Sequence, residues 1–459
     1  MHPAFVTPGA APAVPVWFVT GATWPALREA LEPGARAFAD AAGFEAKPGR
    51  HLLLPGKADG LAGVLFGLET ADDEKDPFRP GRLVDLLPAG TYRFANAPHD
   101  ARLAALAFAL GSYRFARYRA AEAKEVRLEI PAGVDGADLS RIADGVTLAR
   151  DLINTPANDL GPAELEEAVR ALAARHGAQV RSVAGNDLKQ NFPLIHAVGR
   201  AADRAPRLID LAWGDAAHPK ITLVGKGVTF DTGGLDIKPE SAMRMMKKDM
   251  GGAACVLALA HMIMDRGLKL RLRVLIPAVE NAISGAAFRP LDVYRSRKGL
   301  TVEIGNTDAE GRLILADALA LADEEAPELI VDMATLTGAA RVALGPDLPP
   351  FYTEDEALAA EVARCAADEN DPLWRLPLWR PYASMLDSKV ADLNNVTSGG
   401  FAGSITAALF LKRFVATAKS WLHLDVYAWT PTAKPARPEG GECQAARALY
   451  ALLAARYGA

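Results

Sequence analysis

The composition describes an ordinary globular protein with a large core and a nearly balanced charge. Half of the 459 residues are hydrophobic, 23% are charged and the net charge is −5. This charge gives no electrostatic case for nucleic-acid binding, which calls for a basic surface. No apolar run approaches the roughly 20 residues of a membrane helix.

The N-terminal stretch and the cysteines indicate a cytoplasmic protein. The stretch MHPAFVTPGAAPAVPVWFVT has no basic region, and prolines interrupt its apolar part, so we expect no signal peptide. The three cysteines, Cys255, Cys365 and Cys443, are odd in number and far apart. That pattern is typical of reduced thiols in a cytoplasm and not of a disulfide framework.

The first part of the chain is expected to form a small α/β domain over residues 1–135. Short apolar runs such as VWFVT and GVLFGL predict strands, and the amphipathic stretch 101–123 predicts a helix. The Gly-, Pro- and Asp-rich segment IPAGVDGADLS is a plausible boundary. Residues 136–158 are predicted to be a connecting helix and linker, since prolines follow the periodic stretch 138–154.

Residues 159–459 are expected to form a larger α/β domain. Near-continuous apolar strands that alternate with helices predict a central, mostly parallel or mixed sheet flanked by helices. Ser404 is the expected N-cap of the last helix. The predicted strands are 221–225, 272–279, 329–336 and 421–429, and the predicted helices are 251–267, 311–325 and 404–418.

The glycine-rich stretch 224–252 does not match a nucleotide-binding motif. A dinucleotide fingerprint needs a third glycine where Phe230 stands. A P-loop needs Ser or Thr after its Gly-Lys pair, and Gly227 follows Lys226 here. Nucleotide binding is therefore not expected.

A set of charged residues lies instead in apolar surroundings near predicted strand ends and helix starts. Any single carboxylate at such a place is explained by helix capping and by the helix dipole. Several of them converging would repel one another, and a divalent metal such as Zn²⁺ or Mn²⁺ would neutralise them. These residues are Lys226, Asp231, Lys238, Asp249, Asp308 and Glu310.

The histidines offer little competition as metal ligands. The chain has no HExxH motif, and His261 and His423 are isolated within apolar segments. Each is expected to be a core or helix-end residue, so a metal site here would consist mostly of carboxylates.

Three motifs in order resemble the leucine aminopeptidase family, the two-metal M17 metallopeptidases. They are GKGVTFDTGGLDIKP, KDMGGA and NTDAEGRL, and the last is that family's signature. The stretches DLINTPANDLGP, VDMATLTGA and DLNNVTSGGFAGSITAALFL extend the resemblance over about 150–445. It implies a metal-dependent enzyme that releases N-terminal amino acids from peptides by attack of a metal-bridging hydroxide.

The resemblance also implies the ligands of two divalent metal ions per subunit, Zn or Mn. Asp231, Asp308 and Glu310 would hold one ion, with the Asp308 backbone carbonyl assisting. The other ion would be held by Lys226, Asp231, Asp249 and Glu310, so that Asp231 and Glu310 bridge. Lys226 would have to be neutral to serve as a ligand, because an ammonium group has no lone pair.

Further roles follow from the same resemblance. Lys238 would stay charged and stabilise the developing oxyanion, and Arg312 would hold a bicarbonate ion that shuttles a proton. The implied substrate-binding residues are Met246, Asn306, Thr335, Leu336 and Gly338. The residues alone give a plainer reading of TLTG, a turn at a strand end.

The sequence departs from the family after the HLD strand, where the S1 pocket partly lies. Tyr427 and Trp429 are bulky where the family is often small. The pocket could be smaller or rearranged, or both aromatic side chains could point into the core. A preference for leucine therefore does not carry over.

Two alternatives to a general aminopeptidase stay open. One is a narrow dipeptidase on the same site, for example one that hydrolyses Cys-Gly. The other is a DNA-binding role, against which the net charge weighs. The resemblance also implies peptide substrates and a homohexamer built of two trimers.

Overall fold

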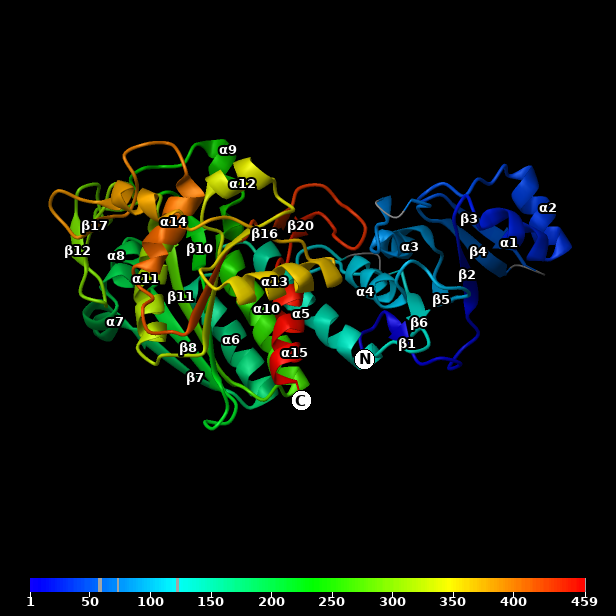
Figure 1. Ribbon diagram of the computed structural model, residues 1–459, viewed down its shortest axis with the longest axis horizontal. Coiled ribbons are helices and arrows are strands. Elements are labelled where there is room, and N and C mark those ends of the chain that lie inside the picture. The colour runs from blue at the N-terminus through cyan, green and yellow to red at the C-terminus, as the bar shows by residue number, and fades with distance from the viewer. Residues whose placement is uncertain (57–59, 72–73, 121–123, 459) are drawn as a thin grey trace. The chain divides into compact units, whose positions relative to one another are not determined.

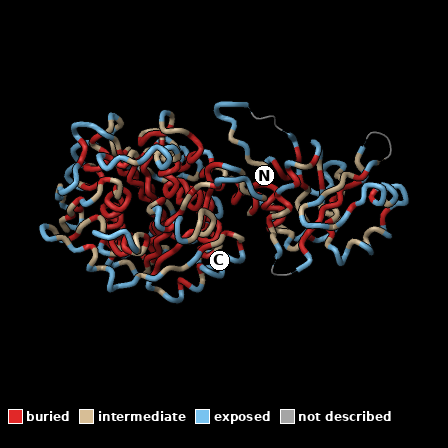
Figure 2. Tube along the Cα trace, turned by 90° about the horizontal axis from the view of Figure 1, so that it is seen from above, coloured by how far each residue is buried: buried red, intermediate tan, exposed pale blue. Residues whose placement is uncertain are grey.

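The computed structural model describes residues 1–56, 60–71, 74–120 and 124–458. The chain divides into two compact units. One contains Met1–Thr147 and Thr432–Glu439, and the other contains Leu148–Pro431 and Gly440–Ala459. Both are α/β units, which confirms the predicted fold class. Figure 2 shows buried positions gathered inside each unit.

The first unit is built on a sheet with strand order β1-β6-β5-β2-β4-β3. Its neighbours pair in parallel except β3, which runs antiparallel to β4. The strands are β1 (Phe5–Val6), β2 (Val14–Val19), β3 (His51–Pro55), β4 (Leu61–Gly67), β5 (Gly90–Phe94) and β6 (Val126–Glu129). The helices are α1 (Trp24–Ala30), α2 (Pro33–Ala41), the 3₁₀ turn η2 (Arg79–Arg82), α3 (Leu83–Leu86), α4 (Ala101–Gly111) and the start of α5 (Gly136–Asn154).

Helix α4 is shorter than the amphipathic stretch 101–123 predicts. It ends at Gly111, which lies so close to Gly81 that a Cβ there would be 2.6 Å from the Gly81 carbonyl oxygen. The chain beyond Ser112 is largely exposed as far as residue 120, so no buried face stabilises a longer helix. Residues 121–123 of the prediction lie outside the described residues.

The second unit is built on a mixed sheet with strand order β16-β15-β18-β14-β9-β11-β8-β7 (Figure 1). Its centre is parallel, and β8, β7 and β15 pair antiparallel to their inner neighbours. The strands are β7 (Gln179–Ala184), β8 (Arg207–Trp213), β9 (Lys220–Gly225), β11 (Arg271–Asn281), β14 (Leu329–Ala334), β15 (Pro350–Tyr352), β16 (Trp374–Arg375) and β18 (Ser420–Asp425). The predicted strands 221–225, 272–279 and 329–336 thus fall on its central strands.

Shorter strands complete the second unit. Strand β10 (Gly227–Asp231) pairs in parallel with β11, and its register shifts between Val228 and Asp231. Two small sheets lie apart from the central one. They contain β12 (Val293–Arg295), β13 (Thr301–Glu303) and β17 (Leu393–Asn394), and β19 (Trp429–Thr430) with β20 (Gly440–Gly441).

Helices cover both faces of the central sheet (Figure 1). Helices α6, α10 and α15 pack together on one face, and α8, α11 and α14 pack together on the other. The helices and 3₁₀ turns of this unit are α6 (Pro162–His176), α7 (Gly185–Asn191), α8 (Pro193–Gly199), α9 (Glu240–Met243), η3 (Met246–Met250), α10 (Gly251–Arg266), α11 (Glu310–Asp323), α12 (Gly338–Leu344), α13 (Glu356–Asp368), η4 (Arg380–Leu386), α14 (Gly403–Lys412) and α15 (Ala446–Tyr457).

Two of these helices are buried around their whole circumference and consist mostly of apolar residues. Every residue of α11 is buried, as is α10 from Gly251 to Met264. Helix α10 packs its start directly on β14, where a Cβ at Gly252 would lie 2.2 Å from the Met333 carbonyl oxygen. Helices with this composition are expected in the interior of a large domain. Among the described residues, every helix is too short or too polar to cross a membrane.

The end of the chain differs from the sequence prediction in two details. Helix α14 ends at Lys412 instead of residue 418, and its N-cap is Ala402, so the prediction of Ser404 as N-cap is wrong. Ser404 lies inside the first turn, and its hydroxyl hydrogen-bonds the Tyr352 hydroxyl at 2.6 Å. A tertiary partner therefore replaces the local capping contact.

Candidate metal centre and substrate cavity

The parallel strands of the second unit bring charged residues to one edge of the sheet. Lys226 follows β9 and Asp231 ends β10. Asp249 lies in η3, directly before α10, and Glu310 is the first residue of α11. Ligands of such sheets bind at the carboxyl ends of the strands. Residues far apart in sequence therefore meet where a ligand would bind.

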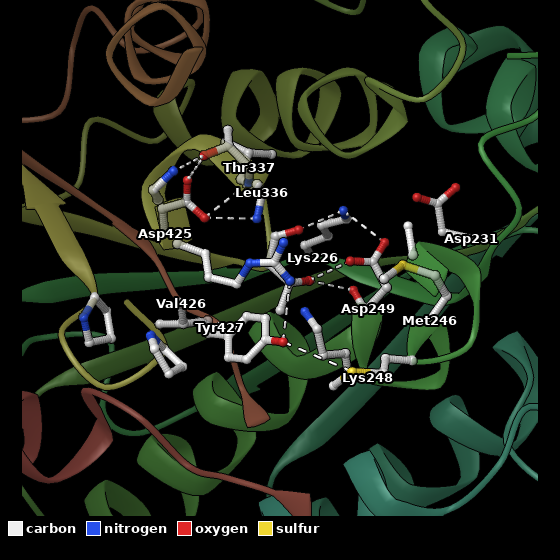
Figure 3. A pocket seen from close by; sticks show the side chains of 18 of the residues that line it. Lys226, Asp231, Met246, Lys248, Asp249, Leu336, Thr337, Asp425, Val426 and Tyr427 are labelled. Atoms are coloured by element: carbon white, nitrogen blue, oxygen red, sulfur yellow. Dashed lines mark hydrogen bonds and ion pairs between the residues drawn. The ribbon is translucent and has the colours of Figure 1, made fainter. Parts of the chain in front are cut away.

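Four carboxylates and two lysines form the cluster. Asp231, Asp308 and Glu310 each offer a carboxylate oxygen, and these oxygens lie within 4.8 Å of one another. The Lys226 Nζ lies 2.8 Å from Asp249 Oδ2 and 2.9 Å from Glu310 Oε1. Figure 3 shows the contact between Lys226 and Asp249 as a dashed line.

The second lysine contacts the other two carboxylates. The Lys238 Nζ lies 2.9 Å from Asp231 Oδ2 and 2.5 Å from Asp308 Oδ1. Two ammonium groups face four carboxylates, so the cluster keeps an excess of negative charge when all are ionised. That excess suits a divalent cation.

The crowding of carboxylates changes their proton affinities. Burial, and then repulsion from Asp231, raise the pKa of Glu310 to about 8. The same two causes raise the pKa of Asp308 to about 6. Burial lowers the pKa of Lys226, but Asp249 and Glu310 outweigh it and hold that pKa above its ordinary value. Protons therefore compete with any cation at this cluster.

The cluster passes a test of fit for divalent metal. Both carboxylate oxygens of Glu310 are buried without a hydrogen-bond partner, although Oε1 lies at ion-pair distance from Lys226. Asp249 Oδ2 and Asp308 Oδ1 are also buried without a hydrogen-bond partner, and each lies at ion-pair distance from a lysine. Buried oxygens with spare lone pairs are the hard ligands that divalent ions take.

Neutral side chains orient the carboxylates. The Asn281 Nδ2 donates to Asp231 Oδ1 at 2.8 Å, and the Thr335 hydroxyl donates to Asp249 Oδ1 at 2.8 Å. Sequence reasoning missed Asn281. Its position at the end of β11, the strand that pairs with β10, was the available signal. Such partners hold ligands in a fixed orientation.

Gly311 in the signature motif has a steric role. A Cβ at this position would lie 2.7 Å from the Lys226 Cε. Glycine therefore lets the lysine stem pass against the first turn of α11 and bring its Nζ to Glu310. A larger residue would displace Lys226 from the cluster.

The cluster opens into a cavity of about 530 Å³. The cavity is lined by Met246, Thr335, Leu336 and Gly338, the residues expected to contact substrate. Asn306 is not among its lining residues. Its Oδ1 instead accepts from the Asp308 backbone N–H at 2.7 Å, so its contact is with the turn that carries Asp308.

Asp425, at the end of β18, holds the TLTG loop against the cavity. Its Oδ1 accepts from the backbone N–H groups of Leu336 and Thr337 at 2.9 and 3.1 Å. Its Oδ2 accepts from the Thr337 hydroxyl at 2.6 Å. Figure 3 shows this contact set. Sequence reasoning noted the HLD strand but missed this role.

Arg312, two residues after Glu310 on α11, is not among the residues that line the cavity. Its Nη1 donates to the Asn395 carbonyl at 2.6 Å, and its buried Nε has no acceptor among the described residues. Burial lowers its pKa to about 10, and Glu310 opposes that effect. The guanidinium therefore stays charged at neutral pH and keeps a donor for an anion.

The two aromatic residues after β18 differ in position. Tyr427 lines the cavity, whereas Trp429 is not among the lining residues. The Nζ of the buried Lys248 lies 4.5 Å from the centre of the Tyr427 ring. Burial lowers the pKa of Lys248 to about 8, which leaves it mostly charged at pH 7. Lys248 was not expected in the cavity from the sequence.

The two histidines of the apolar segments are core residues, as expected. His423 Nδ1 lies 2.5 Å from Asp332 Oδ1 on the neighbouring strand. His261 Nδ1 lies 3.0 Å from His176 Nε2. Neither belongs to the carboxylate cluster.

An α/β unit with a buried carboxylate cluster that opens into a cavity at the strand ends is the arrangement expected of a metal-dependent enzyme. Residues 147–450 match the cytosol aminopeptidase family, catalytic domain, and residues 14–131 match the M17 aminopeptidase, N-terminal domain. The chain belongs to this family. It is a metal-dependent aminopeptidase, and the comparisons give no support to the dipeptidase or DNA-binding alternatives.

Individual relatives are similar to this protein along most of its chain. A probable cytosol aminopeptidase of Roseiflexus castenholzii is 42% identical over 75% of this chain and 74% of its own. The crystal structure of cytosol aminopeptidase from Coxiella burnetii is 44% identical with a TM-score of 0.95, over 99% of each chain. The bottromycin maturation enzyme BotP in complex with Mn is 34% identical with a TM-score of 0.87, over 97% of this chain and 100% of its own.

Proposed function

We propose that the cluster holds two divalent ions, Zn²⁺ or Mn²⁺, bridged by Asp231 and Glu310. Asp308 completes one ligand set, and Lys226 with Asp249 completes the other. The observation that carries this proposal is the convergence of three carboxylates within 4.8 Å, together with the buried Oε2 of Glu310, which has no hydrogen-bond partner. The Mn in the related BotP structure supports a metal of this kind.

Two divalent ions at this place would activate a water molecule and polarise the scissile carbonyl. The protein's part begins with Lys226, which must give up its proton to act as a ligand. Neighbouring dications would depress its pKa, against the raising effect of Asp249 and Glu310. Metal binding at this centre is therefore coupled to proton release.

Lys238 is assigned to the substrate's developing oxyanion. Its ammonium group lines the cavity and lies between Asp231 and Asp308, at the edge of the cluster. Burial lowers the pKa of Lys238, but attraction to Asp231 and Glu310 and the hydrogen bond to Asp308 outweigh it and hold that pKa above its ordinary value. A group that stays charged can stabilise negative charge on the carbonyl oxygen in the transition state.

Arg312 is assigned to a bicarbonate ion. Its buried, unpartnered Nε supplies a donor, and its charge supplies the attraction. Bicarbonate there would relay a proton between water and the leaving amine. The carbonyl of Asn395 fixes the guanidinium through Nη1.

The substrate is a peptide with a free N-terminus. Met246, Thr335, Leu336 and Gly338 would contact it along the cavity wall. The substrate's α-amino group would complete one metal's ligand set, which restricts cleavage to the first residue. We further propose a cytoplasmic homohexamer of two trimers, with an N-terminal domain 1–135, a connector 136–158 and a catalytic domain 159–459.

The test is a panel of aminoacyl-amides assayed with Mn²⁺, Zn²⁺ and Co²⁺, with N-acetyl-leucine amide as the matched blocked compound. We expect metal-dependent hydrolysis of the free amides. The acetylated compound should be neither substrate nor strong competitor, because its nitrogen cannot bind metal. Hydrolysis of the blocked compound at a rate near that of leucine amide would overturn the exopeptidase assignment.

A further inference from the structure

We propose that the cavity binds an acidic side chain on the substrate's N-terminal residue, through Lys248 and Arg341. This inference rests on the proposed peptide-cleaving centre and concerns the end of the cavity at Tyr427. Three observations support it: a buried lysine that forms no ion pair within the described part of the chain, an arginine on the same tyrosine ring, and neighbouring carboxylates that already have partners.

Lys248 is a buried cation that faces the cavity. Its exposed fraction is 6%, and it lines the cavity beside Tyr427. Its Nζ lies 4.5 Å from the ring centre (Figure 3), and no carboxylate within the described residues forms an ion pair with it. Burial of a charge is costly unless the charge is paired, so this ammonium group favours an anionic partner.

Arg341 adds a second cation at the same ring. It lies on α12, lines the cavity, and places its guanidinium carbon 5.5 Å from the centre of the Tyr427 ring. Its Nη1 lies 3.4 Å from the Tyr427 hydroxyl, to which it donates. A guanidinium group can bind a carboxylate through two parallel donors.

The carboxylates nearest to these cations are occupied. Asp425 accepts from Leu336 and Thr337, as described above. Asp249 accepts from Thr335 and pairs with Lys226. Lys226 offsets the charge of Asp249, whereas Asp425 has neutral hydrogen-bond donors and keeps its single negative charge near Lys248. Two cations at Tyr427 therefore face one such carboxylate, which leaves a surplus of positive charge there.

A substrate side chain that reaches Tyr427 meets this charge. A glutamate or aspartate would pair with Lys248 and Arg341 through charge-assisted hydrogen bonds, which are roughly twice as strong as neutral ones. The uncharged amide of the same shape loses this gain, and a lysine side chain is repelled. Apolar side chains would leave both cations unpaired.

The test compares glutamyl and glutaminyl arylamides, which differ in charge but hardly in shape. Their blocked C-terminus makes the side chain the sole carboxylate. We expect kcat/KM of the wild-type enzyme to favour glutamyl by on the order of 10-fold or more. Lys248→Met and Arg341→Met should each bring the ratio towards unity. Arg341 is exposed, so its substitution leaves the core packing intact, and a ratio cancels general changes in activity.

The matched control is Lys247→Met. Lys247 neighbours Lys248 in sequence but does not line the cavity, and its Nζ donates to the Asn154 carbonyl at 2.7 Å. Its substitution should leave the ratio unchanged.

The outcomes separate this proposal from the one before it. If no aminoacyl arylamide is cleaved with metal present, the proposed function fails. If kcat/KM for the glutaminyl compound equals that for the glutamyl compound, only the acidic specificity is wrong. The same holds if both variants keep the glutamyl-to-glutaminyl ratio of the wild type. An acidic preference confined to free dipeptides would assign the cations to the substrate's C-terminal carboxylate and would also overturn this proposal.

Discussion

The two ends of the cavity are built in opposite ways. At one end, Asp231 and Glu310 belong to a cluster with surplus carboxylates and buried, unpartnered oxygens. At the other end, Lys248 and Arg341 flank Tyr427, and neither forms an ion pair with a carboxylate of the described residues. The first end is suited to bind cations and carry out the reaction. The second is suited to recognise a substrate.

The difference also lies in what holds each end in place. The carboxylates lie at strand ends and at the first turn of a buried helix, where the core fixes their positions. At the other end, Lys248 is fixed in η3 beside Asp249, whereas Tyr427 and Arg341 lie on a loop and on the short helix α12. Rigid elements position reacting groups, whereas loops at the rim vary more readily and carry specificity. The predictions below act on one end at a time.

The largest effect is expected at the carboxylate end. Glu310→Ala removes a proposed bridging ligand and should lower kcat/KM by much more than 100-fold, because loss of an outer-sphere partner alone costs about 10–100-fold. The control is Glu324→Ala, at the end of the same helix, whose carboxylate pairs with Arg297 at the surface. Steady-state kinetics of both variants test this, and activity of Glu310→Ala near that of the control would contradict it.

Substitution of the two lysines of the cluster should have different effects on kcat and on metal binding. Lys238→Ala should lower kcat by about 10²–10³ with both metals retained, since removal of one oxyanion donor has effects of that size. Lys226→Ala should instead lower metal occupancy. Metal titration with kinetics on both purified variants separates the roles. The assignments are wrong if Lys226→Ala binds metal like the wild type, or if added metal restores the kcat of Lys238→Ala.

Metal binding should weaken as the pH falls. Glu310 and Asp308 have pKa values raised to about 8 and about 6, so both take up protons as the pH drops through this range. Lys226, whose pKa is also raised, must lose its proton to bind, which acts in the same direction. For each proton that metal binding displaces, the apparent metal affinity should fall by about tenfold when the pH is lowered by one unit. Calorimetric titration at pH 6, 7 and 8 checks this, and an affinity independent of pH would refute it.

The smallest effect is expected from substitution of Asp425, whose carboxylate hydrogen-bonds the TLTG loop. Asp425→Asn weakens charge-assisted hydrogen bonds to Leu336 and Thr337 and should lower kcat/KM by about 10-fold. Asp323→Asn is the matched control, because Asp323 accepts from the backbone N–H groups of residues 416–418 away from the cavity. It should reduce thermal stability alone. Equal kcat/KM losses in the two variants would show that Asp425 has no special role.

Much of the fold could be predicted from the sequence because the core strands are continuous apolar runs. The segments around Ile221 and Ile330 were expected to be buried strands, and both are central in the sheet. Carboxylates at strand ends were expected to converge for the same topological reason. The end of α4 at Gly111 depends instead on close packing against Gly81, which periodicity does not reveal.

The parts of the site that sequence reasoning missed are tertiary contacts. Asn281 orients Asp231 because β10 and β11 pair, and Asp425 clamps the loop after β14 because β14 and β18 pair. Lys248 differs in kind, since its significance lies in the absence of an ion-pair partner within the described ranges. No local pattern reports such a pairing.

The most direct test of the account is a count of metal ions per subunit. Inductively coupled plasma mass spectrometry on the wild type, Asp231→Ala and Glu310→Ala, after equilibration with Mn²⁺ or Zn²⁺, gives this number. The account predicts two ions in the wild type and at least one fewer in each variant, because both carboxylates bridge. Two tightly held ions in either folded variant would contradict the bridged centre.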